Sequence, residues 1–159
     1  MKAALIGLGM VAGTYVDAFR KTSGLTLAAV AARQPDTARA FLEKHPHLTA
    51  RTATVDDIAA DPSIDFVIVT TPPNARHEIV ERMVAVKKPI LMEKPVERTL
   101  TAATTLVDLC AQAGVPLGIM LQHRARPVVA DLRRIMPSLG ALVAAEVTVP
   151  WWRPQSYYD

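Results

Sequence analysis

The sequence predicts an α/β fold in which a parallel sheet is covered by helices on both faces. Short apolar runs alternate with stretches of helical periodicity along the 159 residues. One run, at 66–69, is apolar throughout, as expected for a strand that is buried on both faces. A glycine-rich turn at 7–13 directly follows the first apolar run. Strands and helices that alternate in this way form right-handed crossovers, and therefore a doubly wound parallel sheet.

The first part of the chain predicts three strands, at 3–6, 25–31 and, more weakly, 48–52. A helix follows the glycine turn and ends near Gly24, which suits the position after a helix. Its apolar residues recur at helical spacing: Val11, Ala12, Tyr15, Val16 and Phe19. Pro35 opens a second helix. Thr54 and Asp57 have the spacing of a capping box, so a short helix should follow and end near residue 60.

The second part predicts three more strands, at 65–70, 89–92 and 116–121. One intervening helix has an apolar stripe at Ile79, Val80, Met83 and Val84. The other runs over about 101–113, and Gly114 ends it. Residues 141–149 alternate or are apolar, so we expect them to form the opening strand of a further domain.

Composition and charge exclude several classes of function. The net charge is +3 and the basic residues are scattered, so we expect no nucleic-acid partner. No apolar run approaches the roughly 20 residues of a membrane span. Glycines interrupt the apolar start, which argues against a secretory signal. The single cysteine, Cys110, lies in an apolar helical pattern, so we expect a buried, inert thiol and a cytoplasmic location.

The glycine turn has the form Gly7-x-Gly9-x-x-Ala12, between a strand and a helix. This arrangement is typical of dinucleotide binding, because a Cβ at Gly7 or Gly9 would hold a diphosphate away from the backbone. Met10 and Val11 then open a helix whose free N–H groups attract the anion. The alternative is a tight turn with no ligand; we favour the cofactor.

The end of the second strand indicates which dinucleotide is bound. It reads Ala31-Ala32-Arg33-Gln34, and no carboxylate occurs before Asp36. A carboxylate here would hold the ribose diol of NAD, whereas Arg33 could pair with the 2′-phosphate of NADP or stack on the adenine. We therefore favour NADP over NAD. The alternative is that Arg33 is solvated and the site accepts either cofactor.

Two further loops should lie at the same edge of the sheet. Thr70-Thr71-Pro72-Pro73-Asn74 follows the 65–70 strand, where it would border the nicotinamide ribose, and Asn74 is a good helix N-cap. His77 follows in the first helical turn. We interpret His77 as a packing or capping residue rather than a catalytic one. No HxxxH or CxxC spacing occurs, so we expect no metal site.

Glu93-Lys94-Pro95 follows the next strand and contains the best catalytic candidate. Lys94 would point into the cleft above the cofactor, hydrogen-bond a substrate hydroxyl and stabilise charge as hydride leaves. The alternative is a surface Lys–Glu pair at a strand end.

The chain resembles the N-terminal half of the Gfo/Idh/MocA oxidoreductases. The matching segments are GLGMVAG at 7–13, IDFVIVTTPPNARH at 64–77, LMEKP at 91–95 and LQHRARP at 121–127. The ending WWRPQSYYD is similar to the family's passage into its second domain. The resemblance implies a Rossmann-type domain at 1–121 and the truncated start of a substrate and oligomerisation domain at 122–159.

The same resemblance implies NAD(P)-dependent oxidation or reduction of a sugar, inositol or related polyol carbon. Lys94 would be the catalytic lysine, with Pro95 after a cis peptide. The residues implied for the cofactor site are Gly7, Gly9, Met10, Val11, Ala32, Arg33, Thr70, Thr71, Pro72, Asn74, His77, Glu93, Lys94 and Gln122. Those implied for the substrate are Lys94, His123, Arg124, Trp152 and Arg153. The family commonly has an aromatic residue at the position of Ala125.

Family members also use an Asp-x-x-x-His segment for proton transfer, and none occurs in these residues. We therefore expect this chain to bind cofactor without turning over a sugar, and the full-length protein to be a homo-oligomer. A second hypothesis is a stand-alone NAD(P)-binding module that senses redox state or docks a partner through Trp151, Trp152, Tyr157 and Tyr158. A third is another two-domain dehydrogenase, such as dihydrodipicolinate reductase or homoserine dehydrogenase, against which the Glu-Lys-Pro segment argues.

Overall fold

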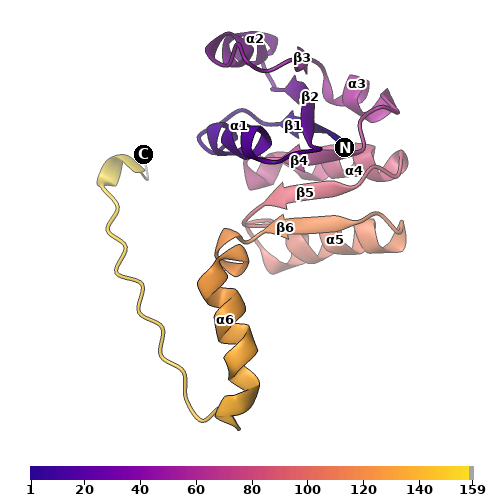
Figure 1. Cartoon of the computed structure of the whole chain (residues 1–159). Helices are drawn as coiled ribbons and strands as arrows, with labels where there is room; N and C mark the ends of the chain where they lie inside the picture. Colours follow the sequence, from indigo (N-terminus) through magenta and orange to yellow (C-terminus); the bar gives the residue numbers. More distant parts are fainter. Residues whose placement is uncertain (158–159) are drawn as a thin grey trace. The chain divides into compact units, whose positions relative to one another are not determined.

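The computed structural model describes residues 1–157. The chain divides between Leu121 and Gln122 into two units (Figure 1). The first unit contains the whole sheet, and the second contains a helix and several short 3-10 turns. Tyr158, one of the aromatic residues predicted for a docking surface, lies outside the described residues.

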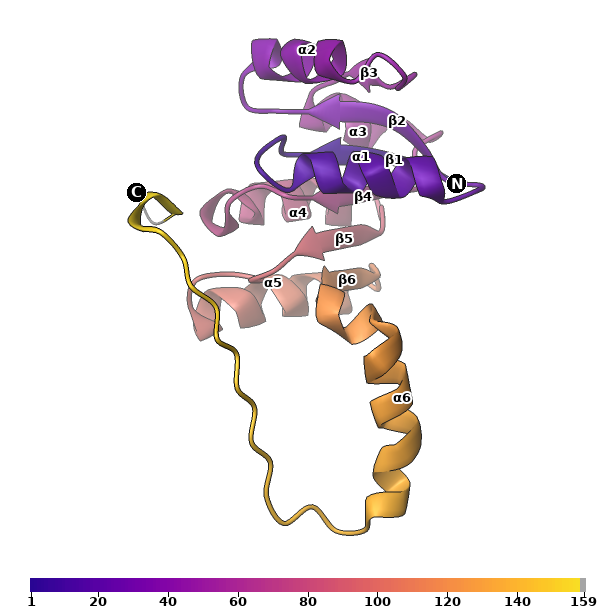
Figure 2. The same cartoon turned by 60° about the vertical axis from the view of Figure 1, so that its left-hand side comes forward.

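Within residues 1–121, six parallel strands form one sheet in the order β3-β2-β1-β4-β5-β6 (Figure 2). The strands are β1 Lys2–Ile6, β2 Thr26–Ala31, β3 Arg51–Thr52, β4 Phe66–Val69, β5 Ile90–Glu93 and β6 Leu117–Met120. β1 lies between β2 and β4. From β1 the chain first adds β2 and β3 on one side of the sheet, and then adds β4, β5 and β6 on the other side. In such sheets the point of reversal, outside the carboxyl ends of the strands, is where ligands bind.

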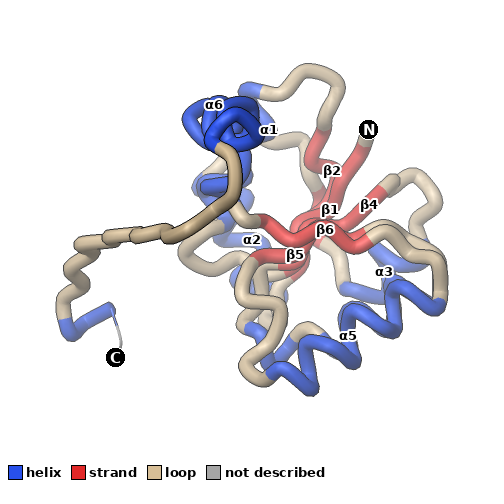
Figure 3. The backbone as a smooth tube through the Cα atoms, turned by 90° about the horizontal axis from the view of Figure 1, so that it is seen from below, coloured by secondary structure: helices blue, strands red, loops and turns tan. Residues whose placement is uncertain are grey.

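Five helices of this unit cover the sheet: α1 Ala12–Lys21, α2 Pro35–Lys44, α3 Val55–Ala60, α4 His77–Ala85 and α5 Leu100–Gln112. On one face, Phe19 of α1 and Ala38 of α2 share a buried cluster with Leu5 of β1. On the other face, α3, α4 and α5 bury side chains such as Met83 and Leu106 against β1, β4 and β5. Figure 3 shows the strands between these two groups of helices. The predicted doubly wound sheet is confirmed.

Local signals explain where several helices begin. Thr54 Oγ1 accepts a hydrogen bond from the Asp57 backbone N–H at 3.0 Å, and Asp57 Oδ2 accepts one from the Thr54 N–H at 2.9 Å, so the predicted capping box is present. Pro35 is the first residue of α2. Asn74, in contrast, is not a helix N-cap. It lies within the 3-10 turn Pro73–Ala75, and Arg76 takes the N-cap position of α4.

The second unit has little regular structure. It contains α6 Pro127–Ile135, with 3-10 turns Gln122–Ala125 before it, Met136–Leu139 after it and Gln155–Tyr157 near the end. Residues 141–149, for which we expected a strand, form no ladder with any described residue and are exposed. An extended segment becomes a strand only when a neighbour takes up its backbone hydrogen bonds. None of the helices in residues 1–157 has the length and hydrophobicity to cross a membrane.

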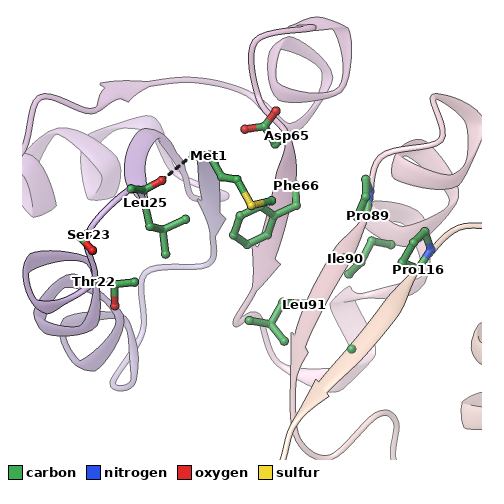
Figure 4. Close-up of a pocket in the computed structure, with 12 residues that line it drawn as sticks. Met1, Thr22, Ser23, Leu25, Asp65, Phe66, Pro89, Ile90, Leu91 and Pro116 are labelled. Atoms are coloured by element: carbon green, nitrogen blue, oxygen red, sulfur yellow. Dashed lines mark hydrogen bonds between the residues drawn. The ribbon is translucent and has the colours of Figure 1, made fainter.

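An apolar hollow of about 460 Å³ lies at the amino ends of the strands. Figure 4 shows the residues that line it. Phe66, Pro89 and Pro116 line it where β4, β5 and β6 begin. Two other residues of its lining are joined by a hydrogen bond of 2.6 Å, which the Met1 amino group donates to the Gly24 carbonyl. The glycine turn follows the carboxyl end of β1, and all the strands are parallel. This hollow, at the amino ends, therefore lies at the opposite edge of the sheet from the glycine turn.

Candidate functional site

Gly7 and Gly9 of the turn have different surroundings. Gly7 has φ +97°, and a Cβ there would lie 2.6 Å from the Thr71 backbone nitrogen. The turn therefore packs directly against the loop after β4, which explains Gly7 without any ligand. Around Gly9, a Cβ would find no atom of the described chain within 4 Å. Gly9 therefore leaves the space that a ligand would need to contact the backbone directly.

The amino end of α1 lies next to Gly9 and can attract an anion. Val11 occupies the N-cap position, no side chain caps the helix, and its first turn carries no acidic residue. The positive end of the helix dipole is therefore not neutralised by the described residues. A helix end of this kind fits a phosphate group.

Two threonines after β4 have different surroundings. Thr70 Oγ1 donates a hydrogen bond of 2.5 Å to the Gly7 carbonyl and so holds the glycine turn in place. The Thr71 hydroxyl is buried and has no hydrogen-bond partner among the described residues. A buried hydroxyl is rarely left unpaired. Thr71 therefore fits a site in which a polar ligand reaches the loop after β4.

A hollow of about 290 Å³ begins at the glycine turn and brings together four of the predicted cofactor residues, Gly7, Ala32, Arg33 and Thr71. Its far wall includes Asp56 and Arg82, and the Arg82 Nε donates to Asp56 Oδ1 at 2.8 Å. Arg33 is exposed and also lines a second hollow of about 480 Å³ with Pro35 and Thr54. The Arg33 side chain is thus available to a group bound beyond the end of β2.

Lys94 follows β5 at the same edge of the sheet, and its side chain is exposed. The Lys94–Pro95 peptide is cis, as the resemblance implied. Among the described residues no ion pair joins Lys94 to Glu93. The Glu93 carboxylate instead accepts a 2.8 Å hydrogen bond from the Tyr15 hydroxyl through Oε1 and a 3.1 Å bond from the Lys94 N–H through Oε2. The surface Lys–Glu pair that we considered is therefore not formed.

Tyr15 belongs to α1 and is 7% exposed. Burial, and then its hydrogen bond to Glu93, raise the pKa of the Tyr15 hydroxyl well above its ordinary value. The hydroxyl therefore stays protonated and continues to donate to Glu93 throughout the range in which the protein would work.

Asn74 and His77 line a different hollow, together with Glu97 and Arg98. His77 is half-exposed, and its Nε2 lies 3.3 Å from Glu81 Oε1 one turn along α4. His77 therefore neither packs in the core nor caps the helix, which corrects our interpretation. The structure does not bring Asn74 and His77 into the hollow that Gly7 and Arg33 line.

The remaining predicted residues belong to the second unit. There the His123 and Trp151 rings lie 6.2 Å apart, and the Arg153 guanidinium carbon lies 4.3 Å from the centroid of the Trp151 ring. The expected roles of Gln122, His123, Arg124, Trp152 and Arg153 toward cofactor or substrate stay predictions. Across residues 1–157, no cluster of three or more His, Cys, Asp or Glu side chains could hold a metal ion.

Sequence reasoning missed two residues of this edge, Tyr15 and Arg76, although each left a signal. Tyr15 lies in an otherwise apolar helical stripe, where a buried hydroxyl must find a partner. Arg76 precedes Ile79 and Val80 by three and four positions and therefore shares the buried face of the following helix. Arg76 is 2% exposed. In both cases the spacing indicates burial, but the hydrogen-bond partners lie in parts of the chain that are distant in sequence.

Comparison with known proteins identifies the family of the chain. The profile of GFO_IDH_MocA, described as an oxidoreductase family with an NAD-binding Rossmann fold, matches residues 1–121. The chain belongs to the Gfo/Idh/MocA oxidoreductase family. The predicted family and the Rossmann-type fold are thereby confirmed.

Three relatives illustrate the similarity. D-apiose dehydrogenase of Rhizobium rhizogenes is 27% identical over 142 residues, covering 89% of this chain and 41% of that protein. Inositol 2-dehydrogenase of Corynebacterium glutamicum is also 27% identical, covering 87% of this chain and 41% of that protein. A crystal structure of an Agrobacterium radiobacter oxidoreductase with NAD+, L-tartaric acid and magnesium has a TM-score of 0.76 at 26% identity, covering 86% of this chain and 40% of that one. This chain thus spans 41% of the length of both curated relatives.

Proposed function

We propose that this protein is an NAD(P)-dependent oxidoreductase that transfers a hydride to or from a sugar, inositol or related polyol carbon. The observation that carries the proposal is that the open Gly9, the uncapped start of α1 and exposed Lys94 occur at one edge of the sheet. Similarity to D-apiose dehydrogenase and inositol 2-dehydrogenase supports the substrate class. Membership of an oxidoreductase family favours an enzyme over a stand-alone binding module.

In this proposal the backbone around Gly9 and the N–H groups at Met10 and Val11 hold the diphosphate. Arg33 and Ala32 line the hollow that would take the adenosine end, and Arg33 favours NADP by pairing with its 2′-phosphate. The unpaired Thr71 hydroxyl gains a partner from the bound dinucleotide. Thr70 and Pro72 border the site from the loop after β4.

Lys94 is the residue that we assign to the reaction itself. The bound nicotinamide ring supplies or accepts the hydride. The exposed Lys94 ammonium group is free of a Glu93 ion pair, so it can donate a hydrogen bond to the substrate hydroxyl and stabilise negative charge on that oxygen. Oxidation of a polyol also requires a group that takes the hydroxyl proton, and the 159 residues contain no Asp-x-x-x-His segment. We therefore expect these residues to bind cofactor without oxidising a polyol, which an assay with inositol and NAD(P) would check.

The proposal is tested by thermal-shift titration of the 159-residue chain with NADP(H) and with NAD(H). A ligand that binds only the folded protein raises its melting temperature, so both cofactors should stabilise the chain, NADP(H) more strongly. Absence of any shift would contradict the binding proposal.

The Arg33→Ala variant tests the cofactor preference. Losing a charge-assisted hydrogen bond of roughly 1.5–3 kcal/mol should weaken NADP(H) binding by roughly 10- to 100-fold and leave NAD(H) binding nearly unchanged. Arg20→Ala is the matched control, because Arg20 is an exposed arginine in the last turn of α1, toward the other edge of the sheet. Equal losses for both cofactors would remove the case for Arg33. A cytoplasmic location and a homo-oligomeric full-length protein stay predictions.

A further inference from the structure

Arg76 is a charged side chain placed where charge is costly. It is 2% exposed, and burial lowers the pKa of its guanidinium, while the nearby carboxylates of Glu93 and Glu97 oppose that effect. Burying a charge is unfavourable unless the group is paired and hydrogen-bonded. The contacts of Arg76 should therefore explain why an arginine occupies this position.

Those contacts are almost all to backbone carbonyls of two separate loops. Arg76 Nε and Nη2 donate to the Thr71 carbonyl at 3.0 and 2.8 Å. Arg76 Nη1 donates to the carbonyls of Glu93 and Pro95 and, at 3.5 Å, to that of Val96. One planar guanidinium therefore joins the loop after β4 to the loop after β5.

The second loop is the one that carries Lys94. The carbonyls that Arg76 binds belong to the residue before Lys94 and to the two residues after it. From the other side, the Lys94 N–H is held by the Glu93 carboxylate, which Tyr15 of α1 fixes through its hydroxyl. The main chain of Lys94 is thus held on both sides while its side chain stays exposed.

We propose that Arg76 is a positioning residue that fixes Lys94 relative to the loop after β4, with the Tyr15–Glu93 hydrogen bond as a second tether to the phosphate-binding helix. The inference rests on the proposed function, in which both loops border the nicotinamide end of the dinucleotide. A reacting group must be held closely in its productive geometry, since a displacement of about 1 Å can reduce rates by about a hundredfold. Five N–H donors in a rigid fork suit this task, and the point charge of a lysine does not.

The first measurement is backbone 15N relaxation of the 159-residue chain without any ligand. The amides of Lys94, Val96 and Glu97 should be as rigid as those of β5, with order parameters near 0.85, although Lys94 is exposed. Order parameters below about 0.6 in the wild type would overturn the proposal without any variant.

The second measurement compares Arg76→Lys with the wild type. The variant keeps the charge but loses the planar arrangement of donors. Order parameters should therefore fall together in the loop after β4, at the amides of Thr71, Asn74 and Ala75, and in the loop after β5, at those of Lys94, Val96 and Glu97, while β1 and β2 keep theirs. Tyr15→Phe, which removes only a hydroxyl, should loosen 93–94 and leave 71–75 unchanged; it remains informative if Arg76→Lys does not fold. Arg20→Lys is the control and should change neither loop. A lower melting temperature with unchanged loop motion would show a merely structural role for Arg76.

The third measurement separates positioning from general stability by comparing NADH with ADP-ribose, which lacks the nicotinamide. Arg76→Lys should weaken NADH binding by about tenfold and ADP-ribose binding by clearly less, because only the nicotinamide end of the dinucleotide meets the loop that carries Lys94. Equal losses for both ligands would contradict the proposal. If neither ligand binds the wild type, the proposed function fails, whereas the relaxation experiments still decide the role of Arg76.

Discussion

Gly7 and Gly9 are two residues apart, yet their surroundings differ. The positive φ of Gly7 and its close approach to Thr71 make it a requirement of the fold. Gly9 has open space where its side chain would be, so no packing contact of the described chain requires a glycine there, whereas the proposed diphosphate site would. A stability measurement and a binding measurement should therefore separate the two positions.

We expect Gly7→Ala to lower the free energy of unfolding by roughly 2–4 kcal/mol, because strained backbone and a clash with Thr71 add together. Gly9→Ala should change that free energy by less than about 0.5 kcal/mol but weaken NAD(P)H binding by at least about tenfold. Urea unfolding and fluorescence titration of NADPH measure the two effects. Full cofactor affinity in Gly9→Ala would contradict the proposed diphosphate site.

At the scale of single elements, α3 is short but well defined at both ends. The capping box of Thr54 and Asp57 begins it, and Asp61 follows its last residue. Asp61 Oδ1 accepts from the Ser63 N–H at 2.9 Å and Oδ2 from Arg51 at 2.7 Å. Hydrogen bonds from Ser63 and Arg51 lower the pKa of the Asp61 carboxyl to about 2, and those from Thr54 lower the pKa of Asp57.

These shifts predict how stability depends on pH. A carboxyl whose pKa is lower in the folded state stabilises the fold above its unfolded pKa and loses that contribution as the pH falls through the folded pKa. For Asp61 the loss should occur between pH 3.8 and about 2. Asp61→Asn should be less stable than the wild type at neutral pH and should lose less stability over that interval, as measured by urea unfolding. Asp108→Asn, at an exposed position of α5, is the control and should keep the wild-type slope.

At the scale of the whole molecule, the core lies entirely within the first unit. Both buried clusters consist of residues up to Met120, and the six strands end there. The described residues of the second unit are almost all exposed, including Trp151 and Trp152. All the residues of the two buried clusters therefore belong to the first unit, so we expect this unit to fold without the second.

We expect a chain of residues 1–121 to melt cooperatively and to bind NAD(P)H as tightly as the 159-residue chain, within about twofold. Circular dichroism melting and fluorescence titration measure the two properties. A non-cooperative transition would show that residues 122–159 complete the core. Weaker binding with an intact transition would indicate that Gln122 or its neighbours contribute to the cofactor site.

The sequence by itself determined the order of strands and helices, the parallel sheet and the edge at which the glycine turn, Thr71 and Lys94 occur. These features depend on periodicity and turn chemistry over a few neighbouring residues, together with the general handedness of crossovers. The same local rules also predicted the capping box of α3 and the burial of Cys110, which is 1% exposed.

Only the tertiary structure decided which side chains meet across loops. The links from Arg76 to the Glu93–Val96 segment and from Tyr15 to Glu93 join residues 17 to 78 positions apart. Their partners are set by how strands and loops pack, which no local pattern encodes. The same reason explains why residues 141–149 form no strand: alternation supplies the side chains, but a ladder needs a neighbouring strand to supply the hydrogen bonds.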